Sequence, residues 1–257
     1  MQPRARTPGP ADATPSVLVV SAAPPLRARN APEQYDDLAH AWWDPQGPFA
    51  ALHWLAAARG ELVPEPSEPG ATLVDLGCGG GLMAPHVPAG FRHVGVDRNA
   101  AALAQAVERG VEAVQGDVTA VPLPDGCAEV VIAGELIEHV EDLPALISEI
   151  ARLLAPGGVA VYDTINATLW ARLSLVWVGE RLPGGPPRHI HDPRLFVPPR
   201  RLAALFSAHG LEVEEQFGLQ VHPPSYVRFL RDRSVPVHME RTRSLAALYA
   251  GRVRRTS

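Results

Sequence analysis

Residues 74–81 read Val-Asp-Leu-Gly-Cys-Gly-Gly-Gly, and this stretch decides the expected fold class. The apolar run 71–76 predicts a buried strand, which Gly77, Gly79 and Gly81 follow at once. Glycine has no Cβ, so a ligand can lie directly against the backbone of such a turn. The spacing is Gly-x-Gly-x-Gly, whereas the third glycine of a dinucleotide fingerprint would fall at Leu82. The stretch predicts a ligand site after the first strand, with a ligand-free tight turn as the alternative.

Downstream of this turn, short apolar runs alternate with helical patterns. We expect further strands at 93–97, 112–115, 127–133, 159–164 and 211–217, and a seventh between 245 and 253. Helices are expected at 99–107, 142–155 and 198–208, because each begins at a capping residue or a proline and carries an apolar face. This alternation is typical of βαβ units that feed a parallel sheet. We therefore expect an α/β domain with a seven-stranded, mostly parallel sheet and helices on both faces.

Acidic side chains stand where the first three strands end. In an open parallel sheet, ligands bind beyond the carboxyl ends of the strands, so these side chains should meet in one crevice. Asp97 can accept hydrogen bonds from both hydroxyls of a ribose. Asp117 can accept from an adenine amine, beside a backbone N–H and an apolar contact from Val118. Asp75 would attract a cationic group and repel a pyrophosphate, which predicts a nucleoside ligand that carries a cation.

Composition narrows the range of partners. The chain has 257 residues and a formal net charge of −5, which argues against nucleic-acid binding. Its two cysteines, Cys78 and Cys127, show neither a disulfide framework nor zinc spacing, so we expect a cytoplasmic protein that acts on a small molecule. Residues 1–30 are expected to form a disordered tail, with a signal or transit peptide as the alternative, and 31–257 to form the domain. The sequence does not indicate an oligomeric state.

The chain resembles the Rossmann-like class I methyltransferases, which use S-adenosylmethionine. The resemblance covers about residues 70–165 and rests on 74–81, Gly95-Val96-Asp97, Gly116-Asp117 and 154–158. It implies that the donor binds at the glycine turn and at the acidic strand ends described above. An NAD-dependent oxidoreductase on the same kind of sheet, and a donor-binding protein without turnover, are the alternatives.

A narrower resemblance, to the ubiquinone-biosynthesis O-methyltransferases, spans about residues 40–220. This resemblance rests on the residues Trp42-Trp43-Asp44, Gly47, Phe49, Leu52-His53, Glu135-Leu136-Ile137-Glu138-His139-Val140, Thr164-Ile165-Asn166, His191-Asp192 and Phe196. It implies methylation of a phenol, catechol, quinol or enol hydroxyl on a small acceptor, prenylated or of secondary metabolism. It also implies that Arg59 touches the donor's carboxylate and that Gly134 contacts the donor. Ala56 stands where the family has Asn, a departure that bears on Arg59.

Glu135, Glu138 and His139 follow the fourth strand, and in a helix they would share one face. Two carboxylates and an imidazole can hold Mg²⁺, Mn²⁺, Fe²⁺ or Zn²⁺. Such an ion would lower the pKa of a bound phenol, and the family resemblance implies magnesium most often. Without a metal, His139 beside Glu138 is the first candidate base and His191 with Asp192 the second. The alternative makes the carboxylates solvated helix residues and His139 a packed side chain.

Two segments outside the alternation, 31–60 and 165–197, are candidate lids. Within 165–182, apolar residues stand at helical spacing: Leu169, Trp170, Leu173, Val176 and Trp177. Arg172 and Arg181 fall on other faces of this helix. The pattern suits a lid over an apolar acceptor, a peripheral contact with a membrane that dissolves a prenylated substrate, or ordinary packing against the sheet.

Overall fold

The structure is a computed structural model that describes residues 26–256. Most of the expected tail, residues 1–25, lies outside the described residues, as does any targeting segment there. Residues 26–30 are described, and Arg27, Arg29 and Asn30 hydrogen-bond to the rest of the chain. These residues, which precede the expected domain start at residue 31, thus already pack on the domain.

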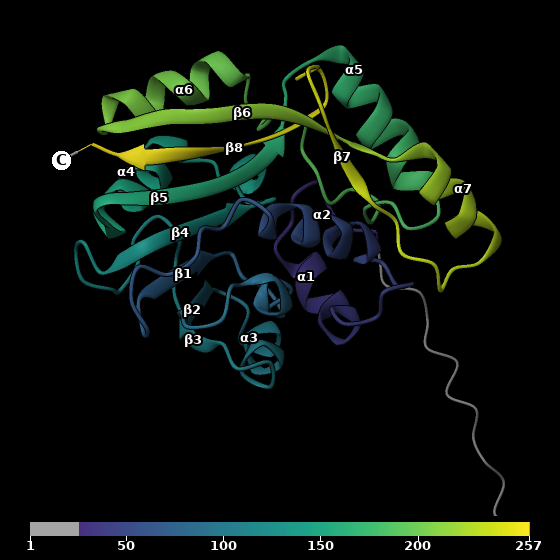
Figure 1. Cartoon of the computed structure of the whole chain (residues 1–257). Coiled ribbons are helices and arrows are strands. Elements are labelled where there is room, and N and C mark those ends of the chain that lie inside the picture. The colour runs from purple at the N-terminus through teal and green to yellow at the C-terminus, as the bar shows by residue number, and fades with distance from the viewer. Residues whose placement is uncertain (1–25, 257) are drawn as a thin grey trace, which may run out of the picture.

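All strands of the described residues belong to one sheet with the order β3-β2-β1-β4-β5-β8-β6-β7 (Figure 1). Their bounds are β1 Thr72–Leu76, β2 Arg92–Asp97, β3 Glu112–Gln115, β4 Ala128–Gly134, β5 Leu154–Ile165, β6 Leu211–Val221, β7 Met239–Thr242 and β8 Leu248–Arg255. Strands β1 to β5 pair in parallel, and β8 runs antiparallel to both β5 and β6. The mostly parallel sheet is confirmed.

The sheet has eight strands, so the expected number of seven is wrong. The added strand, β7, pairs antiparallel with the end of β6, from Gly218 opposite Thr242 to Val221 opposite Met239. Its sequence, Met-Glu-Arg-Thr, has no apolar alternation. The strand forms at the edge of the sheet through backbone pairing, which leaves little trace in a hydrophobic pattern.

Helices cover both faces of the sheet, as expected (Figure 1). Helices α4 (Leu143–Leu153) and α6 (Pro199–Ala208) pack on one face, and α2 (Ala50–Gly60) and α3 (Ala100–Val107) on the other. Asn99 caps α3 by accepting from the Ala102 N–H, and Asp142 caps α4 by accepting from the Ala145 N–H. The side chains that start these helices therefore also fix where the loops at the carboxyl edge end.

The other helical elements of the described residues lie before, between and after these four helices. They are α1 Glu33–Leu38, η1 Ala39–Ala41, η2 Ala84–His86, η3 Ile137–His139, α5 Leu169–Ala171, η4 Arg172–Val178, η5 Gly179–Arg181 and α7 Pro223–Arg231. Elements α5, η4 and η5 follow one another without a break, which confirms a helical segment in the second candidate lid. Among the described residues no helix is both long enough and apolar enough to cross a membrane.

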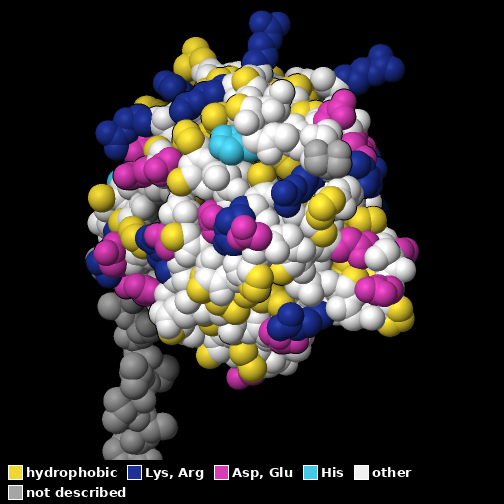
Figure 2. All heavy atoms as spheres, turned by 90° about the vertical axis from the view of Figure 1, so that its left-hand side faces the viewer, with side chains coloured by type: hydrophobic (Ala, Val, Ile, Leu, Met, Phe, Trp, Pro, Cys, Tyr) yellow, Lys and Arg dark blue, Asp and Glu magenta, His cyan; other side chains and the backbone are white. Residues whose placement is uncertain are grey.

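Figure 2 views the molecule from the left-hand side of Figure 1. On this face arginine and acidic side chains are interspersed with separate apolar groups. The large exposed apolar side chains gather elsewhere, mainly on the helical segment 169–182, where they include Leu169, Trp170, Trp177 and Val178.

Candidate active site

A cavity of about 890 Å³ lies at the carboxyl ends of the parallel strands. This volume falls in the upper part of the range typical of ligand pockets, roughly 300–1,000 Å³. Its walls come from the ends of β1, β2 and β4, from residues 30–59, and from residues 174–191. Both candidate lid segments therefore contribute to the cavity wall.

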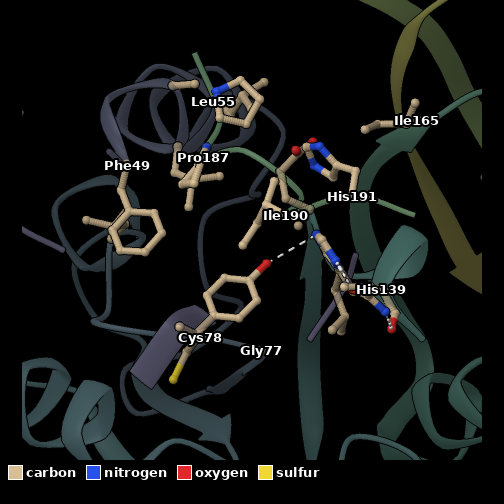
Figure 3. Close-up of a pocket in the computed structure, with 18 of the residues that line it drawn as sticks. Phe49, Leu55, Gly77, Cys78, His139, Ile165, Pro187, Ile190 and His191 are labelled. Carbon is tan, nitrogen blue, oxygen red and sulfur yellow. Dashed lines mark hydrogen bonds between the residues drawn. The ribbon is translucent and has the colours of Figure 1, made fainter. Parts of the chain in front are cut away.

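The glycine turn stands at the base of this cavity (Figure 3). Gly77 lines the cavity, with a φ of 68°. Gly79 and Gly81 are buried instead. A Cβ at Gly79 would overlap the ring of Trp42, and one at Gly81 would meet Ala106 of α3 at 3.0 Å. The turn therefore needs these two glycines for packing, because the first lid segment and α3 press against it.

Asp97 and Asp75 bring two carboxylates to the same region of the cavity. Asp97 ends β2, and its two oxygens accept from the N–H groups of Gly79 at 2.9 Å and Asn99 at 2.8 Å. Burial raises the pKa of Asp97. Asp75 is buried on β1, and its Oδ2 lies 3.5 Å from Nε2 of His93. The backbone thus holds Asp97 in a fixed orientation toward the cavity.

Asp117 lies in a turn two residues beyond β3, which ends at Gln115 rather than at Asp117. Its Oδ1 accepts from the N–H and the hydroxyl of Thr119, and these bonds lower the pKa of Asp117. Both Asp117 and Val118 line the cavity. The expected pair is present at this end of the crevice, in a turn conformation set by Thr119.

Arg59 and Gly134 meet at the cavity wall. Arg59 donates to both oxygens of Asp163, at 2.7 Å from Nε and 2.9 Å from Nη2. A Cβ at position 134 would overlap the guanidinium, so Gly134 gives Arg59 its room. Asp163 is fully buried on β5 and also accepts from the N–H of Glu135 at 2.7 Å. Sequence reasoning missed Asp163, although a lone acidic residue within the apolar run of β5 was a signal for it.

The expected helix through Glu135, Glu138 and His139 is wrong. The segment contains one 3₁₀ turn, Ile137–His139, and Glu135 has a φ of 48°. The left-handed conformation of Glu135 is incompatible with a right-handed helix through that residue, and Asp142 already caps α4, so the segment between forms a 3₁₀ turn instead. The three side chains therefore do not share a helix face.

The structure brings together a different group: Glu138, His139 and His191. One ligand atom from each lies within 4.8 Å of the others, and Glu135 is not a member. The two imidazole rings stack with their centroids 5.2 Å apart, on one wall of the cavity opposite Phe49 (Figure 3). Glu138 is fully buried, and its Oε2 accepts from the hydroxyl of Thr164 at 2.7 Å.

Burial sets the charge of this group. It raises the pKa of Glu138 to about 7 and lowers the pKa of His139 to about 4. Burial also lowers the pKa of His191 well below its ordinary value. Both imidazoles are therefore neutral at pH 7, the state in which histidine ligates metals and accepts protons.

Two atoms of the group are buried without a hydrogen-bond partner, Oε1 of Glu138 and Nδ1 of His191. Buried polar atoms are normally paired, so this pair of orphaned acceptors fits a cation held between them. One carboxylate and two imidazoles suit Zn²⁺, Fe²⁺ or Mn²⁺, whereas Mg²⁺ prefers oxygen ligands. The donor set therefore fits a divalent metal, but fits the expected magnesium less well.

The expected pairing of His191 with Asp192 is wrong. Asp192 forms a bidentate ion pair with Arg194, with its Oδ2 at 2.5 Å from Nη2 and its Oδ1 at 3.0 Å from Nε. The carboxylate of Asp192 is therefore engaged by Arg194 and not by His191. His189 lies outside the group, and its Nδ1 is 2.9 Å from the carbonyl oxygen of Arg27.

Sequence reasoning also missed two residues that contact the ring of His139, Asn30 and Tyr35. Asn30 contacts its ring at 2.6 Å, from Oδ1 to Nδ1, and the Tyr35 hydroxyl lies 3.3 Å from its Nε2. Both precede the glycine turn by about forty residues or more, and no local pattern connects them to it.

Comparisons with known proteins agree with this geometry. A family model described as a methyltransferase domain matches residues 50–216. The chain is 33% identical over 201 residues to the ubiquinone biosynthesis O-methyltransferase of Burkholderia thailandensis, covering 74% of this chain and 86% of that protein. It is 33% identical over 232 residues to the protein of the same name from Cupriavidus pinatubonensis, covering 85% and 93%. A SAM-dependent methyltransferase structure from Thermotoga maritima aligns with a TM-score of 0.61 at 21% identity, covering 87% of this chain and 97% of that chain, which supports the fold alone.

Proposed function

Because the chain belongs to the S-adenosylmethionine-dependent methyltransferases and is an O-methyltransferase, we propose that its acceptor is a phenol, catechol, quinol or enol joined to an apolar group. The observation that carries the proposal is the apolar wall next to the histidines. Leu55, Ile165 and Ile190 line the same cavity as His191 (Figure 3). The relatives' printed names, which refer to ubiquinone biosynthesis, support a ring with an apolar chain.

A panel of acceptors tests this proposal. We expect kcat/KM to rise with the length of an alkyl or prenyl chain on a catechol, by about fourfold per buried CH₂ at roughly 0.8 kcal/mol. Sugars should not be methylated. Ile190→Ser should remove the preference for long chains, whereas Val213→Ser, on the exposed side of β6, should not. Equal rates for bare and alkylated catechols, or for sugars, would contradict the proposal.

The donor is expected to lie along the side of the cavity opposite the apolar wall. Asp97 would hold the ribose, and Asp117 with Val118 the adenine. The amino-acid part would lie near Asp75, Gly77 and the Arg59–Gly134 contact, all of which line the cavity. Gly79 and Gly81 would not contact the donor themselves. They would allow the backbone of the turn to adopt the conformation against which the donor lies. Orientation of donor and acceptor would supply most of the acceleration, up to roughly 7–11 kcal/mol.

Deprotonation of the acceptor is the remaining task. A phenol with a pKa of about 10 lies roughly six units above the pKa of His139, so His139 is a poor base by itself. Glu138, with a pKa of about 7, is the stronger base of the two. We propose that Glu138, His139 and His191 hold a divalent cation, which would act as a Lewis acid on the acceptor hydroxyl. These residues would orient that hydroxyl beside the donor.

Metal analysis distinguishes a bound cation that acts on the acceptor hydroxyl from Glu138 acting as a base without a metal. Glu138→Gln and His191→Ala should each lose the bound metal and the activity while donor affinity stays within about twofold. Glu141→Gln is the matched control, because Glu141 is exposed at the cavity and lies outside the cluster. If enzyme stripped by a chelator, and shown to be metal-free by elemental analysis, still worked at the original rate, the metal would play no part.

The helical segment 169–182 supports a peripheral membrane contact. Its exposed side chains include Leu169, Trp170 and Trp177, with exposed fractions of 72%, 61% and 67%. Its other residues, among them Leu175 and Leu182, line the cavity, so an apolar acceptor could enter from a lipid surface.

Sedimentation with lipid vesicles tests this contact. The protein should bind vesicles that contain anionic lipid, and Trp170→Ser with Trp177→Ser should abolish binding. Val213→Ser, an exposed apolar residue on β6, should not. Binding unchanged by the double substitution would place the contact elsewhere.

A further inference from the structure

The segment that precedes α1 is hydrogen-bonded to the parts of the chain that carry the two active-site histidines, His139 and His191. Arg29 donates from Nη1 to Glu180 at 3.1 Å and to the carbonyl oxygen of His191 at 2.9 Å. Glu180 is buried, so this ion pair is shielded from water on one side. The N–H of Asn30 donates to the carbonyl oxygen of His189 at 3.0 Å. These bonds hold the backbone of residues 29 and 30 against the 189–191 loop.

Asn30 contacts His139 twice through its side-chain amide. Its Nδ2 donates to the carbonyl oxygen of His139 at 3.0 Å, and its Oδ1 lies 2.6 Å from ring Nδ1. Because the amide nitrogen is committed to the carbonyl, only the amide oxygen faces the ring. A short contact between an amide oxygen and a ring nitrogen requires a proton on that nitrogen. The φ of Asn30 is 58°, a left-handed conformation that asparagine tolerates better than most residues.

The tautomer follows from this geometry. With its proton on Nδ1, neutral His139 keeps the lone pair on Nε2. Nε2 faces the Tyr35 hydroxyl at 3.3 Å, and His139 lines the cavity. In the opposite tautomer, lone pairs of Nδ1 and of the Asn30 oxygen would face each other at 2.6 Å. That arrangement is repulsive, so Asn30 selects the first tautomer.

We propose that Asn30 is a positioning residue: it locks His139 as the Nδ1–H tautomer and so presents the Nε2 lone pair to the cavity. The role of that lone pair, as a ligand to a cation or as an acceptor for the hydroxyl proton, rests on the function proposed above. A hydrogen bond that fixes the tautomer of a functional histidine is a recurrent device. Here it comes from a segment that sequence patterns assign to a tail.

Nitrogen NMR of the ¹⁵N-histidine-labelled full-length protein reports the tautomer directly, with or without turnover. Wild-type His139 should show a protonated Nδ1 and an unprotonated Nε2, before and after treatment with a chelator. Asn30→Gly, which suits a positive φ, should shift His139 toward Nε2–H, the form that free imidazole prefers. Tyr35→Phe should keep Nδ1–H. A wild-type Nε2–H signal, or a switch in Tyr35→Phe but not in Asn30→Gly, would overturn the proposal.

Kinetics give a second readout. Asn30→Gly should lower kcat at least tenfold and leave the KM for the donor unchanged, because the hydrogen bonds of Asn30 go to His139 and His189 and to none of the residues expected to hold the donor. Asn30→Asp keeps an acceptor for Nδ1–H and should recover most of the loss, with the acid limb of the kcat profile moved to higher pH. Arg27→Ala breaks the Arg27–Asp37 ion pair on the same segment and should leave kcat unchanged.

These outcomes separate the two proposals. If no acceptor were found but the tautomer behaved as described, the assignment of Asn30 would stand and the proposed acceptor would be wrong. If Asn30→Gly retained full kcat, or Asn30→Asp were as slow as Asn30→Gly, Asn30 would not position His139 for the reaction.

Discussion

The guanidinium of Arg59 binds both carboxylate oxygens of Asp163, and the pair is almost completely buried, with side-chain exposures of 7% and 0%. The ion pair joins α2, which belongs to the first candidate lid segment, to the central strand β5. Asp163 also accepts from the backbone of Glu135, so one carboxylate ties together three parts of the active site.

Asp163→Ala should therefore destabilise the protein strongly. Removing one partner of a buried ion pair leaves the other charge buried and uncompensated, which costs about 3–5 kcal/mol. Urea unfolding followed by circular dichroism would measure the loss. Asp125→Ala, which breaks the ion pair of the largely exposed Asp125 with Arg152, is the control, and it should cost at most about 1 kcal/mol. Equal effects of the two substitutions would contradict the structural role of Asp163.

Gly134→Ala should displace Arg59. The new methyl group would occupy the space of the guanidinium, so we expect a loss of about 1–3 kcal/mol from overpacking. If Arg59 also contacts the donor, affinity for S-adenosylmethionine should fall by tenfold or more, measured by calorimetry. An unchanged affinity in a folded variant would mean that Arg59 does not touch the donor.

Asp97→Ala should weaken donor binding while the fold persists. Each charged hydrogen bond to the ribose contributes about 1.5–3 kcal/mol, so the dissociation constant should rise at least tenfold. The metal content should remain that of the wild type, because Asp97 is not part of the Glu138, His139 and His191 cluster. Calorimetry that gave the wild-type dissociation constant would remove Asp97 from the ribose site.

The stability of the metal-free protein should depend on pH through Glu138. Its folded pKa of about 7 lies above the ordinary value of 4.5, so between these values the folded state binds a proton that the unfolded state has lost. The stabilisation is complete below pH 4.5 and is lost as the pH rises through 7. Glu138→Gln removes this dependence, so its stability relative to wild type should improve by up to about 3 kcal/mol between pH 4.5 and 8.

Urea unfolding of both proteins at each pH, in the presence of a chelator, measures this difference. His139 acts in the opposite direction, since its pKa is lowered to about 4 and stability falls as the pH drops from 6.5. Because both proteins contain His139, its contribution cancels when they are compared at the same pH. Glu135, whose pKa is raised by burial and by the neighbouring Glu138, titrates with it, so the difference reports the pair of carboxyls. A difference that did not vary with pH would show that this pair does not take up a proton on folding.

A resemblance at the motif residues indicated the family, and the sequence by itself determined the class of sheet and the side on which ligands bind. The sheet and the ligand side follow from local rules: apolar runs form strands, capping residues start helices, and glycines and aspartates at strand ends must meet at the carboxyl edge of a parallel sheet. Gly77, Asp97 and Asp117 were found in this way, and the structure places all three at the cavity. The sequence did not predict the eighth strand, β7, because an edge strand held by backbone pairing needs no apolar pattern.

Only the tertiary structure decided which side chains meet at His139. A spacing argument grouped Glu135 with Glu138 and His139 on a helix face, but Glu135 has a φ of 48° and only a 3₁₀ turn forms at 137–139. The carboxyl of Glu135 therefore lies beside Glu138 without joining the group that His191 completes. His191 and Asn30 reach the same ring from 52 residues after it and 109 residues before it in the chain. Contacts over such separations depend on how loops from different strands fold over one edge of the sheet, and no periodicity within a single segment records that.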